Sequence, residues 1–150
     1  MKTRMSVLLL SAGMIGILTG CATTYRIQAQ ATDGASRALA EQVEDDVYGA
    51  LVSCGYHVRK KSAVWLRTTD INLDVTRKEV ARLADWRMYE GRVRAEVVSG
   101  RGDVMWEKRF RALGERSKDE EEAEASAESG LANQITEWLS TVLPSAKTFH

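Results

Sequence analysis

The 150-residue sequence has few of the residue types that most often build catalytic or metal centres. It contains two histidines and two cysteines, whereas a zinc site needs about three or four clustered ligands. No serine lies in a nucleophile-elbow motif, and the glycines do not have the spacing of a phosphate-binding loop. Carboxylate pairs can be drawn, but none lies in an apolar setting that would separate the two pKa values. We therefore predict no catalytic residue, no metal site and no cofactor.

An excess of charge of either sign is also absent. The chain has 21 basic and 21 acidic residues, so its formal net charge is zero. A nucleic-acid-binding domain usually carries a basic footprint, and we exclude nucleic acid as a partner. Apart from the N-terminus, no hydrophobic segment approaches the roughly 20 apolar residues that a membrane-spanning helix needs.

The N-terminus is the most informative part of the chain. Lys2 and Arg4 precede an apolar run at 7–18, which is the length expected of a signal peptide rather than a membrane span. The run ends in Leu18-Thr19-Gly20-Cys21. This order resembles the signals of bacterial lipoproteins, which implies that Cys21 is acylated and anchors the protein to a membrane. The alternative is an ordinary secretory signal whose cleavage site precedes a cysteine.

Two further expectations depend on this signal. In proteobacterial lipoproteins an aspartate after the acylated cysteine retains the protein at the inner membrane, so Ala22 favours the outer membrane, facing the periplasm. If Cys21 carries lipid, Cys54 has no partner for an intramolecular disulfide. The apolar neighbours Leu51 and Val52 predict a buried thiol. An exposed thiol that bridges two molecules is the alternative.

Two segments have the periodicity of amphipathic helices. In 35–54 the apolar residues recur at steps of three and four, Ser36 is the expected cap, and Gly55 follows as a terminating glycine. The segment 118–143 has a strongly acidic start, which is favourable at a helix N-terminus. Its apolar positions are Ala127, Leu131, Ile135, Trp138, Leu139 and Val142.

The remaining segments alternate with a period of two, as strands do. We expect strands near 23–31, 56–61, 71–76, 86–99 and 104–111, with 63–66 as a further short strand or a continuation. The predicted fold class is α+β, an antiparallel β-meander of about four strands with two amphipathic helices packed on one face. The predicted organisation is a signal peptide at 1–20, a lipidated N-terminus with a short strand at 21–34, the α+β domain at 35–143 and a flexible tail at 144–150.

The sheet face away from the helices is predicted to carry arginines and carboxylates on neighbouring strands. Such a face can be a solvated surface stabilised by cross-strand charge pairs. It can also be a docking face, because arginine is enriched in interfaces and grips carboxylates with two hydrogen bonds. The candidate partner face is made of Arg92, Arg94, Glu96, Glu107, Arg109 and Arg111.

The tryptophans give a second indication of exposed surface. Trp106 and Trp138 fall on predicted core faces. Trp86, beside Met88, is predicted to lie in the core or at its rim, with a partner anchor as the alternative.

The order of motifs resembles small periplasm-facing lipoproteins, above all the YajG-like family. The matching motifs are the lipobox, a helix ending in Cys54-Gly55-Tyr56-His57-Val58, the strand 70–75, a hairpin at Gly100 and a final helix. A weaker resemblance is to auxiliary lipoproteins of lipopolysaccharide assembly and of ABC lipid transport. These families act through surfaces, which implies a non-catalytic accessory or scaffold subunit with an envelope protein as partner. The alternative function is a lipid or small-molecule carrier or sensor with its site between helices and sheet.

Overall fold

The computed structural model describes residues 23–60 and 68–144. The predicted signal, Cys21, Ala22, the segment 63–66, Trp65 and the tail beyond 144 lie outside these ranges. None of the described helices is long and apolar enough to cross a membrane. The elements are β1 (Thr24–Ala31), η2 (Gly34–Ser36), α1 (Arg37–Ser53), β2 (His57–Arg59), β3 (Thr69–Leu83), β4 (Trp86–Val98), β5 (Val104–Leu113) and α2 (Glu120–Val142).

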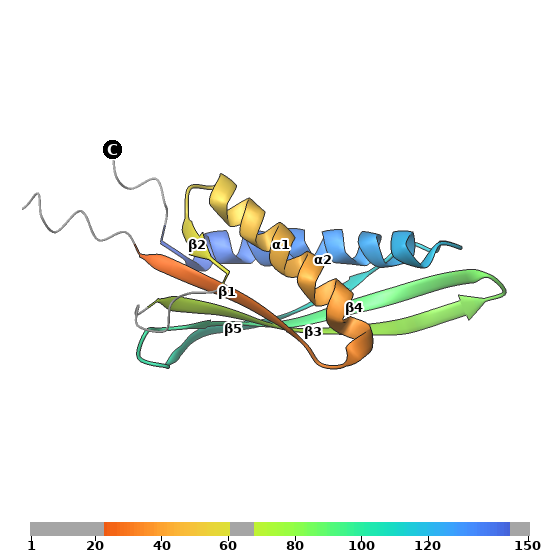
Figure 1. Ribbon diagram of the computed structural model, residues 1–150, viewed down its shortest axis with the longest axis horizontal. Helices are drawn as coiled ribbons and strands as arrows, with labels where there is room; N and C mark the ends of the chain where they lie inside the picture. The colour runs from red at the N-terminus through yellow and green to blue at the C-terminus, as the bar shows by residue number, and fades with distance from the viewer. Residues whose placement is uncertain (1–22, 61–67, 145–150) are drawn as a thin grey trace, which may run out of the picture.

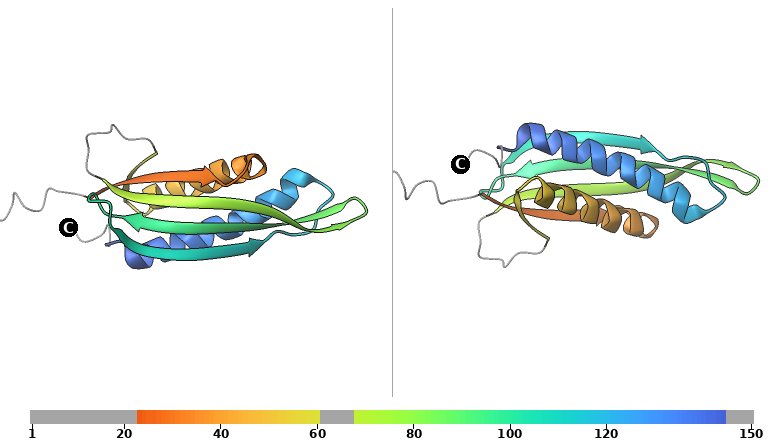
Figure 2. Two further views of the ribbon diagram at one scale, coloured as in Figure 1. Left: turned by 90° about the horizontal axis from the view of Figure 1, so that it is seen from below. Right: turned by 90° about the horizontal axis from the view of Figure 1, so that it is seen from above.

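Five strands form one sheet in the order β2-β1-β3-β4-β5, and both helices cover the same face of it (Figures 1 and 2). This confirms the predicted α+β class and the one-sided helical layer. The predicted antiparallel meander is present as β3, β4 and β5, and the sheet has five strands rather than about four. β1 pairs in parallel with both β2 and β3. The reason is that α1 carries the chain back to the end where β1 began, so β2 must run parallel to β1.

The start of α1 differs in part from the sequence prediction. Ser36 stands at the N-cap position of α1, as predicted, but its side chain makes no capping hydrogen bond there. Asp33 caps the preceding turn η2, and its carboxylate accepts a hydrogen bond from the Ser36 backbone N–H at 2.8 Å. The Ser36 hydroxyl accepts instead from the backbone N–H of Arg77 on β3, also at 2.8 Å. This bond ties the start of α1 to the middle of the sheet.

The end of α1 is where the sequence predicts it. Gly55 has φ of +91°, the left-handed conformation of a terminating glycine. Cys54, predicted to be buried, is exposed. It lies past the last helical residue, beyond the part of α1 that packs on the sheet.

The core lies between the helices and the sheet. Leu39, Val43 and Leu131 from the helices and Ile71 and Val93 from the sheet are buried. Gly91 allows α2 to approach β4 closely, because a Cβ at this position would collide with Leu131. At Gly130 a Cβ would lie 3.1 Å from the Cβ of Ala112 on β5. The two layers are therefore in direct contact where a bound lipid would have to enter, which disfavours a carrier site at this position.

β3 and β4 continue well past the helices as a hairpin arm, residues 79–88, which turns at Ala84 (Figure 1). The sequence pattern predicts that the first of these strands ends at residue 76, whereas β3 continues to Leu83. Alternation marks a strand only when one of its faces is buried. Most side chains of the arm are exposed, among them Arg82, Leu83 and Trp86.

Candidate functional site

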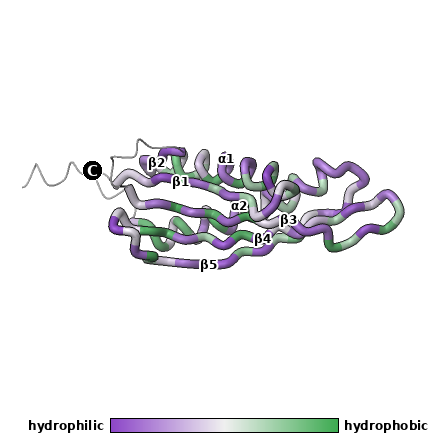
Figure 3. The backbone as a smooth tube through the Cα atoms, turned by 60° about the horizontal axis from the view of Figure 1, so that its bottom comes forward, coloured by the Kyte–Doolittle hydropathy of each residue, from purple (hydrophilic) through white to green (hydrophobic). Residues whose placement is uncertain are grey.

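The outer face of the sheet brings all six predicted partner-face residues together; we call them the charged face. Arg92, Arg94 and Glu96 point outward from β4, and the alternation of hydrophilic and hydrophobic residues along the strands is visible in Figure 3. The register places like charges directly opposite one another on β4 and β5. The opposed pairs are Arg92 with Arg111, Arg94 with Arg109, and Glu96 with Glu107.

Arg94 pairs with a carboxylate that lies diagonally across on β5, that of Glu107, rather than with the residue directly opposite. Its Nε and Nη2 donate to the two carboxylate oxygens of Glu107 at 3.0 and 3.2 Å. Its Nη2 also lies 2.7 Å from Oε1 of Glu96 on the same strand. Arg109 has no carboxylate within 4.0 Å among residues 23–60 and 68–144. One guanidinium of the opposed pair is thus held by two carboxylates, and the other is unpaired among the residues that the structure describes.

Glu90 holds the second arginine pair. Its side chain is 1% exposed, and one of its oxygens accepts from Nε of Arg111 at 2.7 Å while the other is paired with Arg92. The hydrogen bond from Arg92 lowers the pKa of Glu90, with Arg111 acting in the same direction, although burial opposes the effect. The carboxylate therefore stays ionised beneath the two arginines and fixes them on the face.

These arginines border a shallow groove of about 510 Å³. Asp74 is the one carboxylate among the residues that line it, against four arginines. The hydroxyls of Thr32 and Thr76 lie 2.9 Å apart at its margin. The lining is Thr32, Asp74, Thr76, Arg92, Val93, Arg94, Arg109, Phe110 and Arg111. Guanidinium groups bind carboxylates with paired hydrogen bonds, so this groove is suited to an anionic group of a partner.

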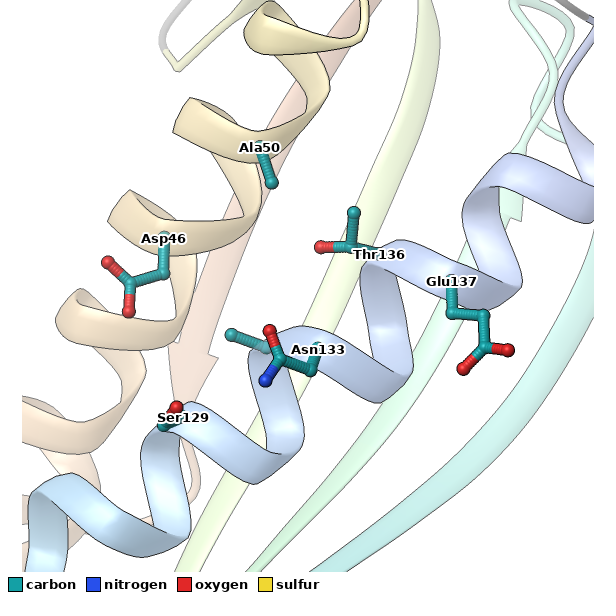
Figure 4. A pocket seen from close by; sticks show the side chains of 7 residues that line it. Asp46, Ala50, Ser129, Asn133, Thr136 and Glu137 are labelled. Carbon is teal, nitrogen blue, oxygen red and sulfur yellow. The ribbon is translucent and has the colours of Figure 1, made fainter.

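A second hollow of about 470 Å³ lies between the two helices, on the opposite side of the molecule (Figure 4). Asp46 of α1 and Asn133 of α2 line it from opposite helices. Next to Asp46, Glu128 is 7% exposed and its Oε1 has no hydrogen-bond partner. Burial, together with the hydrogen bond and charge of Asp46, raises the pKa of Glu128 to about 8.

This carboxyl pair could not be predicted, because nothing in the sequence relates Asp46 to Glu128, which meet only when the helices pack. The pair is not part of a metal centre, since the described residues contain no cluster of three or more potential metal-binding side chains. We therefore expect the stability of the contact between the helices to depend on pH.

Of the three tryptophans that the structure describes, Trp138 packs against the core as predicted and the other two are more exposed than predicted. Trp138 is half-buried and packs edge-on against Phe110, with ring centroids 5.6 Å apart. Trp106, predicted to be in the core, is 36% exposed, because it lies toward the start of the edge strand β5 whereas α2 covers the later part of that strand. Trp86 is 45% exposed on the hairpin arm, so it is not a core residue.

Trp86 belongs to an apolar groove of about 740 Å³ on the arm, beside Val80 and Leu83. Three arginines complete its lining, namely Arg82, Arg87 and Arg116. The ammonium of Lys118 lies 5.4 Å from the centre of the Trp86 ring. The arm is thus a second exposed surface, apolar with a basic margin.

No family model matches the chain, and no curated protein matches it in sequence. Solved structures do share its fold. A minor lipoprotein from Acinetobacter baumannii aligns with a TM-score of 0.53 and 12% identity over 80% of this chain and 94% of that chain. A neuraminyllactose-binding hemagglutinin homolog from Helicobacter pylori aligns with a TM-score of 0.54 and 12% identity, over 82% of this chain and 86% of that chain.

PelC from Paraburkholderia phytofirmans, solved as a dodecamer, gives a TM-score of 0.53 and 16% identity over 77% of this chain and 85% of that chain. At these identities the likeness establishes a shared fold. The chain thus shares its fold with a bacterial lipoprotein, and the resemblance to the YajG-like family remains a prediction.

Proposed function

We propose that this protein is a non-catalytic lipoprotein of the bacterial cell envelope, anchored through Cys21, that binds an acidic segment of a partner protein on the charged face. In this role it is an accessory or scaffold subunit of an envelope complex. The lipobox supports the anchor, and Ala22 supports the outer membrane, facing the periplasm. The structural likeness to lipoproteins is consistent with this role.

The observation that carries the docking role is the opposition of Arg94 and Arg109. Like charges directly opposite each other destabilise an antiparallel pair, and opposite charges would stabilise it. A face shaped by stability alone would therefore place a carboxylate at one of these two positions. The unpaired Arg109 and the groove lined by four arginines leave hydrogen-bonding capacity for carboxylates of another molecule.

Packing separates this role from that of a carrier. A carrier would need an apolar space between the helices and the sheet, where Leu131 instead packs directly over Gly91. The hollows at the charged face, between the helices and on the hairpin arm are surface grooves bordered by charged side chains. The dodecameric state of PelC shows that a protein with this fold can form an assembly, which fits a subunit role.

The test is crosslinking in living cells, followed by purification of the mature lipoprotein and identification of the crosslinked partner. The variant Arg94→Glu/Arg109→Glu reverses two charges on the charged face. The matched control Arg82→Glu/Arg116→Glu reverses two exposed charges beside the hairpin arm. We expect one defined envelope protein to be captured by the wild type and the control, and lost from the charged-face variant. Capture by all three proteins would place the docking site elsewhere.

The anchor is tested separately with Cys21→Ser. We expect the wild type to incorporate fatty acid and to fractionate with membranes, and the variant to do neither. An unmodified Cys21 in the mature wild-type protein would contradict the anchor and leave the charged face as a separate question.

A further inference from the structure

The end of the domain that lies nearest the predicted anchor carries exposed apolar side chains. β1 begins at Thr24, three residues after Cys21. Three residues reach at most about 10–11 Å, so an acylated Cys21 holds the start of β1 close to the surface of the bilayer. The turn between β4 and β5 lies at this same end of the sheet (Figures 1 and 2).

The strand register also places this turn at the end of the sheet where β1 begins. Val104 on β5 is opposite Val98 on β4, Val98 is opposite Asp70 on β3, and Asp70 is opposite Arg26 on β1. Val104 therefore stands in the same row as a residue only two positions after the start of β1. The turn, residues 99–103, projects beyond that row toward the anchored end.

Three consecutive residues after this turn are unusually exposed for their type. Val104 is 54% exposed, Met105 47% and Trp106 36%. Tryptophan favours the interface between water and hydrocarbon, where its ring is apolar and its N–H can still bind water or headgroups. The turn itself carries both Arg101 and Asp103, so attraction to this surface comes from apolar contact rather than net charge.

We propose that the apolar end formed by Val104, Met105 and Trp106 inserts into the interface of the bilayer that holds the Cys21 lipid, so that the domain stands on the membrane with its hairpin arm pointing away. This inference rests on the proposed lipid anchor. Stable anchoring takes more than one acyl chain, which the resemblance to bacterial lipoproteins implies for Cys21. The lipid leaves the orientation of the domain open, and the apolar end fixes it.

The orientation has a measurable geometric consequence. β3 has 15 residues, which at the usual rise of a strand span about 45–50 Å. The tip of the hairpin arm, with Leu83 and Trp86, is then held far from the bilayer, although Leu83 is 73% exposed and more accessible than Met105. If exposed apolar surface alone decided, the hairpin arm would insert into the bilayer. The anchor at Cys21 instead brings the turn between β4 and β5 to the bilayer surface.

The test uses an environment-sensitive fluorophore on a single cysteine in the full mature lipoprotein. In a Cys54→Ser background, Met105→Cys or its matched control Leu83→Cys is labelled, and the acylated protein is placed in vesicles of phosphatidylethanolamine and phosphatidylglycerol. Spin-labelled lipid should quench the label at 105 at least about threefold more than the label at 83, because an interfacial group sits about 5–10 Å into the headgroup boundary. Aqueous iodide should show the reverse preference.

Two controls separate the possible failures. Flotation with the vesicles and the mass of the N-terminal peptide report acylation in the same samples. An acylated protein with a water-exposed label at 105, or with equal lipid quenching at 105 and 83, would overturn this orientation and leave the anchor intact. A protein without the acyl group would overturn the lipid-anchored function and, with it, this inference.

Discussion

Arg94 and Arg109 lie directly opposite each other on β4 and β5, and within residues 23–60 and 68–144 only Arg94 is neutralised by carboxylates, those of Glu96 and Glu107. Stability and docking therefore favour different residues at position 109. A carboxylate there would pair with Arg94 and strengthen the sheet, whereas an arginine keeps a free guanidinium for a partner.

The substitution Arg109→Glu tests this conflict. We expect it to raise the free energy of unfolding by about 0.2–1 kcal/mol, because an opposite-charge pair replaces a like-charge pair. The same substitution should weaken capture of the partner. Chemical denaturation and the crosslinking assay measure the two effects in parallel. A gain in stability with unchanged capture would show that the face is only a solvated surface.

Glu90 should act as a positioning residue for the charged face. We expect Glu90→Gln to lower the midpoint of thermal unfolding, because Arg92 and Arg111 lose the buried carboxylate that they share. The pKa of Glu90 is lowered in the folded protein, so its contribution is present above the ordinary pKa of glutamate and is lost as the pH falls through the lower, folded value. The thermal midpoint at neutral and acid pH checks this. An equal midpoint for wild type and variant at neutral pH would contradict it.

Two glycine-to-alanine substitutions should change the free energy of unfolding in opposite directions. Gly91→Ala forces a Cβ against Leu131, and overpacking of this kind costs about 1–3 kcal/mol. Gly49→Ala, in the middle of α1 with nothing within 4 Å of the added Cβ, should stabilise by about 0.5–1 kcal/mol, since alanine is the better helix former. Urea unfolding of both variants measures the difference. A neutral or stabilising Gly91→Ala would contradict the direct contact of the two layers.

The Glu128 pair predicts a loss of stability as the pH rises from about 4.5 to about 8. The folded pKa of about 8 lies above the ordinary value of 4.5, so the folded state binds the proton more tightly, and stability falls as the pH rises from the unfolded value to the folded one. Glu128→Gln keeps the shape of the side chain without the charge. It should flatten this dependence and stabilise the protein at pH above 8 by about 1–3 kcal/mol, the cost of an unsatisfied buried group.

The pH profile of the free energy of unfolding, measured for the wild type and for Glu128→Gln, tests this account. Asp46→Asn is the companion variant, because it removes the neighbouring charge and should move the wild-type transition to lower pH. Parallel profiles for wild type and Glu128→Gln would mean that Glu128 does not titrate in this range.

Much of this fold could be predicted from local patterns. The amphipathic faces of α1 and α2 and the alternation in β4 follow from residues such as Leu39, Leu131 and Val93, each of which is buried as predicted. The placement of β1 between β2 and β3 could not be predicted, because strand order is a long-range property that alternation does not encode.

The candidate site was predictable to a similar extent. The side shared by Arg92, Arg94 and Glu96 follows from alternation alone, but their register against β5 does not, and the opposition of Arg94 to Arg109 depends on it. Trp106 is exposed because α2 does not cover the start of β5. How far a helix extends over a sheet depends on tertiary packing and cannot be predicted from alternation.

The central claim is that a partner contacts the outer face of the sheet. A photo-crosslinking amino acid at Thr76, which lines the groove beside the arginines and leaves Arg109 in place, tests it most directly, with the same amino acid at Glu137 in α2, an exposed position beside the groove between the helices, as control. We predict a single envelope-protein adduct from position 76 that is lost when Arg94→Glu/Arg109→Glu is added, and no such adduct from position 137. An adduct from position 137 and none from position 76 would contradict the docking role of the charged face and move the docking surface to the helices.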